Sequence, residues 1–308
     1  MLKKALVTGA NGFVGSWLCR ELTANHAEVY AVVKDENENI DNIIDLPGLH
    51  IVYCELSQIM DLPQKIPVRD IDVFYHMAWV GVSGPLGSDY NVQLENVRYS
   101  CDAVSACHEM CCPRFIFSSS IMEYECAKAL QTINPVHIKH MYSVAKIAAN
   151  YMAKLLAFSL NIEYISAIIS NTYGPGENSP RLINTTLRKM LKGEKTSFTA
   201  ATQMYDFIYI EDTVKAFYKI GLLGHANKSY YIGTISPKPL KDFLMEIHSC
   251  MDAQHALGLG EITFKGVSLS YDEFNIYELR DDTQFTPETD FKQGIIQTAE
   301  WIKGNDLI

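Results

Sequence analysis

The stretch "LVTGANGFVG", residues 6 to 15, joins a short apolar run to a glycine-rich turn and then to the start of an amphipathic segment. Its glycines recur at intervals of three residues, at Gly9, Gly12 and Gly15. Gly9 permits a tight turn, Gly12 lets the backbone approach a ligand, and Gly15 lets a helix pack close to the strand. A pyrophosphate would meet the N–H groups of that helix. The stretch therefore predicts a dinucleotide-binding strand, turn and helix, with a simple strand-to-helix turn as the alternative.

Outward from this turn, short β-branched runs alternate with longer amphipathic segments, the pattern of repeated βαβ units. The expected helices are residues 13–25, 88–110 and 137–159. This order predicts an α/β fold, a Rossmann-type doubly wound parallel sheet with helices on both faces. The expected strands are residues 4–9, 27–33, 50–56, 72–78, 114–120 and 162–170.

The regular alternation ends near Pro175, where "YGPGENSPR" reads as a loop. Beyond it the sequence predicts a helix at 181–193, a strand followed by a helix within 205–223, a strand at 229–233 and a helix within 238–251. We expect a nucleotide-binding domain and a smaller C-terminal substrate-binding lobe. The first comprises residues 1–170, with 205–234 returning to it, and the second comprises 171–204 and 235–308.

Composition narrows the class of protein. The chain has 308 residues, a formal net charge of −10 and no long run of lysine or arginine, which argues against a nucleic-acid partner. From the pattern of the first ten residues and the lack of a long apolar run, we expect neither a signal peptide nor a membrane span. The eight cysteines lack the spacing of a zinc site or a disulfide framework. We expect a soluble cytoplasmic protein without a metal site.

A second motif, "YSVAK", places Tyr142 and Lys146 one helical turn apart on one face. A tyrosine hydroxyl titrates near pH ~10, and a nearby positive charge favours its anion, so this pair could exchange protons with an alcohol or ketone. Alone, the pair would read as a surface pair on a helix.

With these motifs in order, the chain resembles the extended short-chain dehydrogenase/reductase family, in particular its nucleotide-sugar branch. The resemblance covers nearly the whole chain. It implies that Tyr142 is the general acid and base, that Lys146 holds the cofactor ribose and lowers the pKa of the tyrosine, and that Ser120 polarises the carbonyl. The motifs that carry it are "TGANGFVG" at 8–15, "YHMA" at 75–78, "FIFSSSIMEY" at 115–124, "YSVAK" at 142–146, "NTYGPG" at 171–176 and "DFIYIEDTVKAF" at 206–217.

The cofactor implied by the resemblance is NADP or NAD. Enzymes of this fold distinguish the two at the end of the second strand, where an acid binds the ribose hydroxyls of NAD or a cation binds the 2′-phosphate of NADP. Val33 and Lys34 occupy that place and favour NADP, although Asp35 and Glu36 would oppose the lysine. The expected cofactor contacts are Gly9, Asn11, Gly12, Phe13, Val14, Gly15, Lys34, Met77, Ala78, Asn96, Ser118, Tyr142 and Lys146.

The reaction is less defined. Dehydratases of the family carry Asp-Glu directly after the catalytic serine or threonine, whereas this chain has Ile121 and Met122, which argues against dehydration. A 4-ketoreductase that uses NADPH to make a deoxyhexose for surface polysaccharide is our first expectation, because of Lys34. A nucleotide-sugar 4-epimerase with tightly bound NAD is the alternative. A non-catalytic nucleotide sensor is disfavoured, since such proteins lack the Tyr-Lys pair.

The substrate site departs from the family. Two arginines are replaced by Ile168 and Tyr205, and the second of these arginines usually grips a diphosphate, which a tyrosine cannot do. Arg181 and Arg280 could supply the lost cation; otherwise the substrate is a smaller ketone or alcohol. The expected substrate contacts are Ser120, Asn171, Arg181, Tyr205 and Arg280.

We also expect a homodimer. The helices at 88–110 and 137–159 carry small residues that permit close packing, and related proteins pair two such helices about a twofold axis. The same residues could instead seat the helices on their own sheet. They are Ala103, Ala106, Ala145, Ala148 and Ala149.

Overall fold

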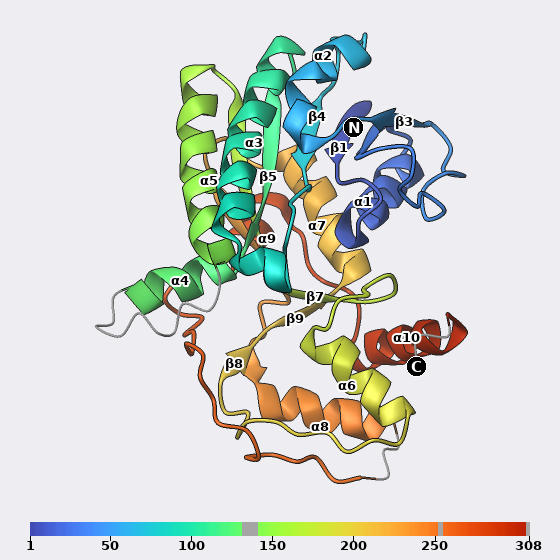
Figure 1. Ribbon diagram of the computed structural model, residues 1–308, viewed down its shortest axis with the longest axis vertical. Helices are drawn as coiled ribbons and strands as arrows, with labels where there is room; N and C mark the ends of the chain where they lie inside the picture. The colour runs from blue at the N-terminus through green and yellow to red at the C-terminus, as the bar shows by residue number, and fades with distance from the viewer. Residues whose placement is uncertain (131–140, 252–254, 306–308) are drawn as a thin grey trace.

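A computed structural model describes residues 1–130, 141–251 and 255–305 (Figure 1). Its centre is a seven-stranded sheet in which every neighbouring pair of strands is parallel. The strands are β1 (Lys4–Thr8), β2 (Glu28–Val33), β3 (Leu49–Tyr53), β4 (Val73–His76), β5 (Arg114–Ser120), β6 (Glu163–Ile169) and β10 (Ser229–Ile232).

The strand order is β10-β6-β5-β4-β1-β2-β3, a doubly wound arrangement in which the chain reverses direction across the sheet after β3. The predicted Rossmann-type fold is therefore confirmed. The reversal falls between β1 and β4, and ligands of such sheets bind in the crevice outside the carboxyl ends of the strands at that point.

Helices cover both faces of this sheet (Figure 1). On β1, Ala5 and Val7 pack with α1 (Phe13–Ala24) and α7 (Ile210–Leu223), whereas Leu6 points to the other core with α3 (Tyr90–Glu109) and α5 (Met141–Ser159). Both faces are buried, which explains why β1 is a continuous apolar run rather than an alternating one.

Several segments from the second half of the chain form a smaller assembly beyond the carboxyl ends of the strands, in the lower part of Figure 1. The buried apolar side chains of its helices belong to the same core cluster as α1 and α7. It contains β7 (Asn171–Tyr173) paired with β9 (Phe207–Tyr209), β8 (Met204–Tyr205) paired with β11 (Lys238–Pro239), and the helices α6 (Leu182–Leu191), α8 (Leu240–Cys250) and α10 (Phe291–Gly304).

Several elements were not predicted from the sequence. The most important is α4 (Met122–Leu130), which follows β5 directly and carries two acids in its first turn. The others are short or late in the chain. They include η1 (Leu56–Asp61), α2 (Leu62–Lys65), η2 (Pro85–Ser88), α9 (Glu278–Thr283), α10 and the short strands β7 and β11. Residues 137–140 of the predicted helix 137–159 lie outside the described residues.

The alanines of α3 and α5 face inward. Ala103, Ala106, Ala145 and Ala149 are buried within the chain, where the two helices pack against each other and the sheet. These alanines therefore seat the helices on their own sheet, as the alternative reading of the sequence held. Among the described residues, no helix is long and apolar enough to cross a membrane.

Candidate active site

The glycine-rich turn connects β1 to α1 and needs its glycines. Gly9 has a φ of +64°, and a Cβ there would lie 2.9 Å from the Ala78 Cα. A Cβ on Gly15 would lie 2.1 Å from the Gly9 carbonyl oxygen, so only glycine lets α1 start this close to β1. Gly12 is the N-cap of α1 and offers no side-chain cap. The first turn of α1 is thus suited to an anion at its N-terminus.

A cleft of about 330 Å³ opens beside this turn, at the crevice expected from the strand order. The cradle formed by the glycines and the helix N-terminus fits the pyrophosphate of a nicotinamide dinucleotide. Most of the predicted cofactor residues lie together in this cleft. They are Gly9, Asn11, Gly12, Phe13, Val14, Gly15, Met77, Ala78, Ser118, Tyr142 and Lys146.

Two predicted cofactor residues do not line the cleft. The Lys34 ammonium is exposed and lies 3.4 Å from the Asp35 carboxylate. Asn96 is buried, and its side-chain amide bonds both the N–H and the carbonyl of Val80, at 2.9 and 2.8 Å. Asn96 therefore fixes the loop after β4, whose Val82 and Ser83 reach the cleft.

The three predicted catalytic residues converge. Ser120 ends β5, and Tyr142 and Lys146 lie on the first turns of α5, both buried. Burial raises the pKa of Tyr142 to about 12, while a hydrogen bond with Ser120 and the charge of Arg181 oppose this rise. The sequence led us to expect the opposing charge from Lys146, but here Arg181 supplies it.

The position of Lys146 explains this difference. Its Nζ donates a hydrogen bond to the Ser118 carbonyl oxygen at 2.7 Å and lies 3.9 Å from the centre of the Trp79 ring. Burial lowers the pKa of Lys146 to about 7, and the charge of Glu123 opposes this shift. The ammonium is therefore held behind the phenol, in an aromatic pocket, and loses part of its charge near neutral pH.

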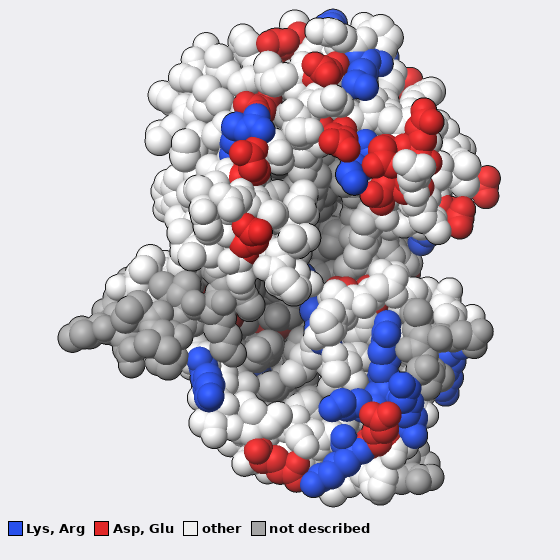
Figure 2. Space-filling view, viewed as in Figure 1, with Lys and Arg blue, Asp and Glu red and all other residues white. Residues whose placement is uncertain are grey.

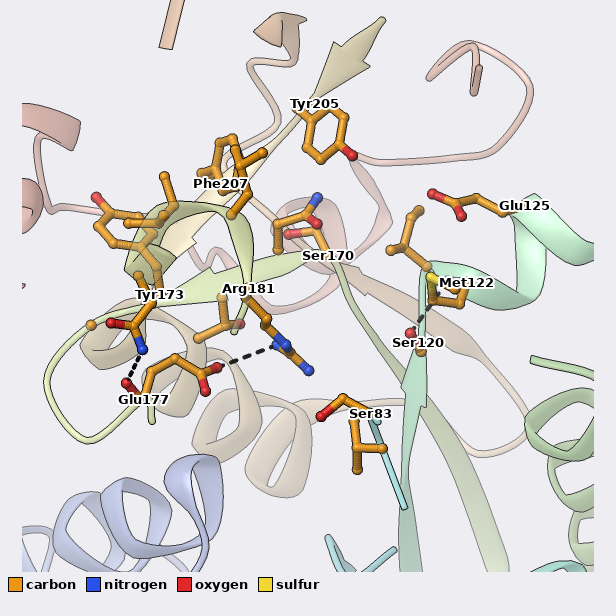
Figure 3. Close-up of a pocket in the computed structure, with 18 of the residues that line it drawn as sticks. Ser83, Ser120, Met122, Glu125, Ser170, Tyr173, Glu177, Arg181, Tyr205 and Phe207 are labelled. Carbon is orange, nitrogen blue, oxygen red and sulfur yellow. Dashed lines mark hydrogen bonds and ion pairs between the residues drawn. The ribbon is translucent and has the colours of Figure 1, made fainter. Parts of the chain in front are cut away.

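A second cavity, of about 350 Å³, adjoins the first on the side of the smaller assembly. Four predicted substrate residues, Ser120, Asn171, Arg181 and Tyr205, line it. Figure 3 shows Arg181 projecting into it between Glu177 and Ser120. Ser120, Tyr142 and Arg181 line both cavities, so the catalytic groups stand where the two meet.

The fifth predicted substrate residue, Arg280, is not brought to this place. It lies on α9, where its guanidinium bonds the Asp281 carboxylate at 2.9 Å and lies over the Tyr277 ring. Neither cavity includes it. Arg181 is the one cation that lines the second cavity within the described part of the chain, and it lies 3.7 Å from the Glu177 carboxylate.

Tyr205 stacks on Phe207, with ring centres 5.4 Å apart. Burial, and to a smaller degree the charge of Glu125, raise the pKa of Tyr205 to about 12. Tyr205 is therefore neutral at physiological pH and offers a hydroxyl and an apolar face where an arginine would offer charge.

Sequence reasoning missed three features of the site. Trp79 covers Lys146, Glu177 is buried beside Arg181, and Glu123 enters a buried network behind the lysine. Of these, Glu123 had a visible signal, because it is an acid only three residues after the predicted catalytic residue Ser120. Trp79 had none, since its role depends on the loop after β4.

This combination of a doubly wound sheet, a glycine cradle and a Ser-Tyr-Lys cluster defines a class, the dinucleotide-dependent oxidoreductases. The comparisons narrow the class. Residues 5–233 match the NAD dependent epimerase/dehydratase family, and the chain belongs to that family. The resemblance found in the sequence is thus confirmed.

Individual relatives agree with this assignment. The chain is 25% identical to a putative UDP-glucose 4-epimerase of Methanocaldococcus jannaschii, over 98% of this chain and 99% of the relative. Two solved structures share the fold. UDP-glucose 4-epimerase of Thermotoga maritima with UDP-glucose has a TM-score of 0.79 and 16% identity, covering 98% of this chain and 99% of that one. WbmF of Bordetella bronchiseptica with NAD+ and UDP has a TM-score of 0.80 and 18% identity, covering 99% and 93%.

Proposed function

We propose that this protein oxidises and reduces a ring carbon of a nucleoside-diphosphate sugar, with Ser120, Tyr142 and Lys146 as its catalytic residues. The observation that carries the proposal is the position of Ser120 and Tyr142, which line both the cofactor cleft and the adjoining cavity. A substrate in the second cavity would present its reacting carbon to these two hydroxyls and to the cofactor.

In this proposal the glycine turn and Lys146 hold the dinucleotide, which when bound supplies two-electron oxidation and reduction. Tyr142 transfers the proton at its phenolic oxygen, and Ser120 holds the substrate oxygen by a hydrogen bond. Arg181, which already opposes the raised pKa of Tyr142, stabilises the phenolate when the proton leaves.

The first candidate reaction is 4-epimerisation with NAD retained in the cleft. The loop between β2 and β3, residues 34–48, holds five acids and one base, and Figure 2 shows acids gathered on that side of the molecule. This loop is tied to the glycine turn, because Asn42 Nδ2 donates to the Asn11 carbonyl at 2.9 Å. An acidic loop at the adenosine end disfavours a 2′-phosphate and so supports NAD.

The second candidate is a 4-ketoreductase that consumes NADPH and makes a deoxyhexose for surface polysaccharide. Lys34 favours it, since this lysine directly follows β2 and its side chain is exposed. Rotation away from Asp35 would bring its ammonium to a 2′-phosphate. In either reaction the smaller assembly, residues 171–204 and 235–308, serves as the substrate-binding lobe.

We further propose that the protein is a homodimer through the outer face of α3 and α5. This face carries exposed apolar side chains that a monomer would leave in water, including Leu155 at 69% and Phe158 at 71% exposure. The surface over α5 is mainly white, free of charged colours, in Figure 2. The other members are Tyr90, Leu94, Val144, Tyr151 and Met152.

The two reactions differ in what the purified protein carries. Denaturing it and identifying the released nucleotide should give close to one NAD per chain if the protein is an epimerase, because the cofactor stays bound through each turnover. A site that is empty and binds NADPH more tightly than NADH would overturn the epimerase and support the reductase.

A further inference from the structure

We propose that Glu123 is a positioning residue for the catalytic pair: its half-buried carboxylate favours the ammonium form of Lys146 and so sets the pH range in which Tyr142 exchanges protons. The proposal rests on the role proposed above for Tyr142 and Lys146. It concerns a residue that touches neither cavity of the active site.

Strand β5 brings the two charges together. Lys146 Nζ donates to the carbonyl oxygen of Ser118, and the hydroxyl of the next residue, Ser119, donates to Glu123 Oε1. Lys146 and Glu123 are therefore bound to adjacent residues of one strand. Trp79 and Phe117 cover the ammonium, with ring centres 3.9 and 4.8 Å from Nζ, and exclude water from it.

Both oxygens of Glu123 accept hydrogen bonds in the structure. Asn150, one helical turn after Lys146, donates from Nδ2 to Glu123 Oε2 at 2.9 Å. The orientation of this amide is fixed, because Asn150 Oδ1 accepts from the Tyr164 hydroxyl at 2.9 Å. Since Ser119 also donates to the carboxyl, the arrangement suits a carboxylate better than a neutral acid.

A negative charge here matters because the surroundings of Lys146 otherwise oppose its positive charge. Burial lowers the pKa of Lys146, and the charge of Glu123 is what raises it. Burial also raises the pKa of Glu123, while Ser119, Asn150 and Lys146 lower it. Each charge thus offsets the desolvation of the other, as in other buried pairs.

No other described group near the lysine can replace this charge. His76 on β4 is buried, and its pKa is lowered to about 3, so it stays neutral. Tyr164 on β6 has a pKa raised well above its usual range by burial. The remaining titratable groups beside Lys146 or Glu123 are Tyr142, Tyr151 and Lys154 on α5 and Tyr124 and Cys126 on α4.

Glu123 can also exchange protons with water outside the active site. It lines a separate pocket of about 230 Å³ between α4, α5 and the β6–β10 side of the sheet, together with Asn150 and Lys154. This pocket lies apart from the two active-site cavities, so water there could exchange a proton with Glu123 without passing the substrate.

Trp79 gives a direct readout that needs no substrate. Its ring contacts Lys146 Nζ, so the indole fluorescence changes as the lysine gains or loses its proton. The emission of the intact protein would be titrated between pH 5 and pH 9, with nucleotide content matched among preparations. Trp79→Phe and Lys146→Met assign the transition, because each should remove it.

We expect the wild type to titrate near pH 7 and Glu123→Gln, which keeps the shape of the side chain, to titrate lower by about one pH unit. Glu163→Gln, the same change at a surface position of β6, should leave the midpoint unchanged. If Glu123→Gln does not fold, Ser119→Ala is the second variant. It removes one hydrogen bond that stabilises the ionised form of Glu123, and it should shift the midpoint in the same direction. An unchanged midpoint in the folded variants would overturn the proposal, whatever the substrate proves to be.

Discussion

At the scale of single residues, the site depends on the burial of two polar side chains, a phenol and an amine, whose charged forms are destabilised by the loss of water. Tyr142 and Lys146 are both covered by the chain, and burial moves their pKa values in opposite directions, to about 12 and about 7. Each shift favours the neutral form. A phenol that keeps its proton suits the reduction of a ketone, whereas oxidation of an alcohol needs the charge of Arg181 and of a bound cofactor to draw the proton away.

The buried lysine should leave a signature in stability. Its pKa is lowered from 10.5 to about 7 on folding, so the unfolded chain binds more protons between these values. The free energy of unfolding of the wild type, relative to that of Lys146→Met, should therefore rise as the pH increases from 7 toward 10. At ~1.4 kcal/mol for each pKa unit of the shift, the total rise should be roughly a few kcal/mol. Urea denaturation of both proteins at a series of pH values measures this difference.

Lys241→Met is the matched control, since Lys241 is exposed on α8. Its difference from the wild type should not change over the same pH range. A Lys146→Met difference that is equally flat would mean that the lysine is not desolvated as described.

At the scale of elements, the sequence predicted the strands and helices that are marked by apolar periodicity and by glycine-rich or proline-containing turns. The glycine turn and the apolar run of β1 are local signals, and so is the helix that carries Tyr142 and Lys146. Each could be predicted because its own residues decide it. The catalytic trio was predicted for a further reason, namely that its spacing along the chain matches a known family.

Elements that depend on distant partners were missed. The segment of α4 was not predicted as a helix, and it holds Glu123 and Glu125 in its first turn. In the structure, Glu123 finds Asn150 on α5, a contact between residues 27 apart that no local pattern encodes. Arg280 was misjudged for a different reason, because two residues close to it in sequence, Asp281 and Tyr277, hold its side chain on α9, away from the cavity.

At the scale of the whole molecule, the site exists because two parts of the chain meet. The sheet supplies the cofactor cleft, and the segment from β7 to α6 supplies Arg181 and Glu177 on its other side. The core that joins them is continuous, since α6, α8 and α10 share an apolar cluster with α1 and α7. The strand pattern predicted the first part. In the second part the sequence predicted the helices α6 and α8 but no regular alternation of strands and helices.

The outer face of α3 and α5 predicts association of whole molecules. Phe158→Asp places a charge on a side chain that is 71% exposed in the single chain, so it should dissociate the dimer without unfolding the monomer. Sedimentation at about 10 µM measures the oligomeric state of the wild type and the variant, at a concentration where dimers with an interface of standard size stay associated. Met245→Asp, at an apolar position on α8 that is 53% exposed, is the control and should leave the dimer intact. A monomeric wild type would contradict the interface.

The central claim is that Tyr142 moves the proton during oxidation and reduction of a nucleotide sugar. The most direct test compares the wild type with Tyr142→Phe in converting nucleoside-diphosphate hexoses and their 4-keto derivatives, at equal nucleotide content. We predict that the variant keeps its nucleotide and its fold and loses at least ~100-fold in rate, the usual contribution of a positioned acid or base. Conversion by the variant at a rate near that of the wild type would contradict the account, as would a variant that loses nucleotide binding and turnover together.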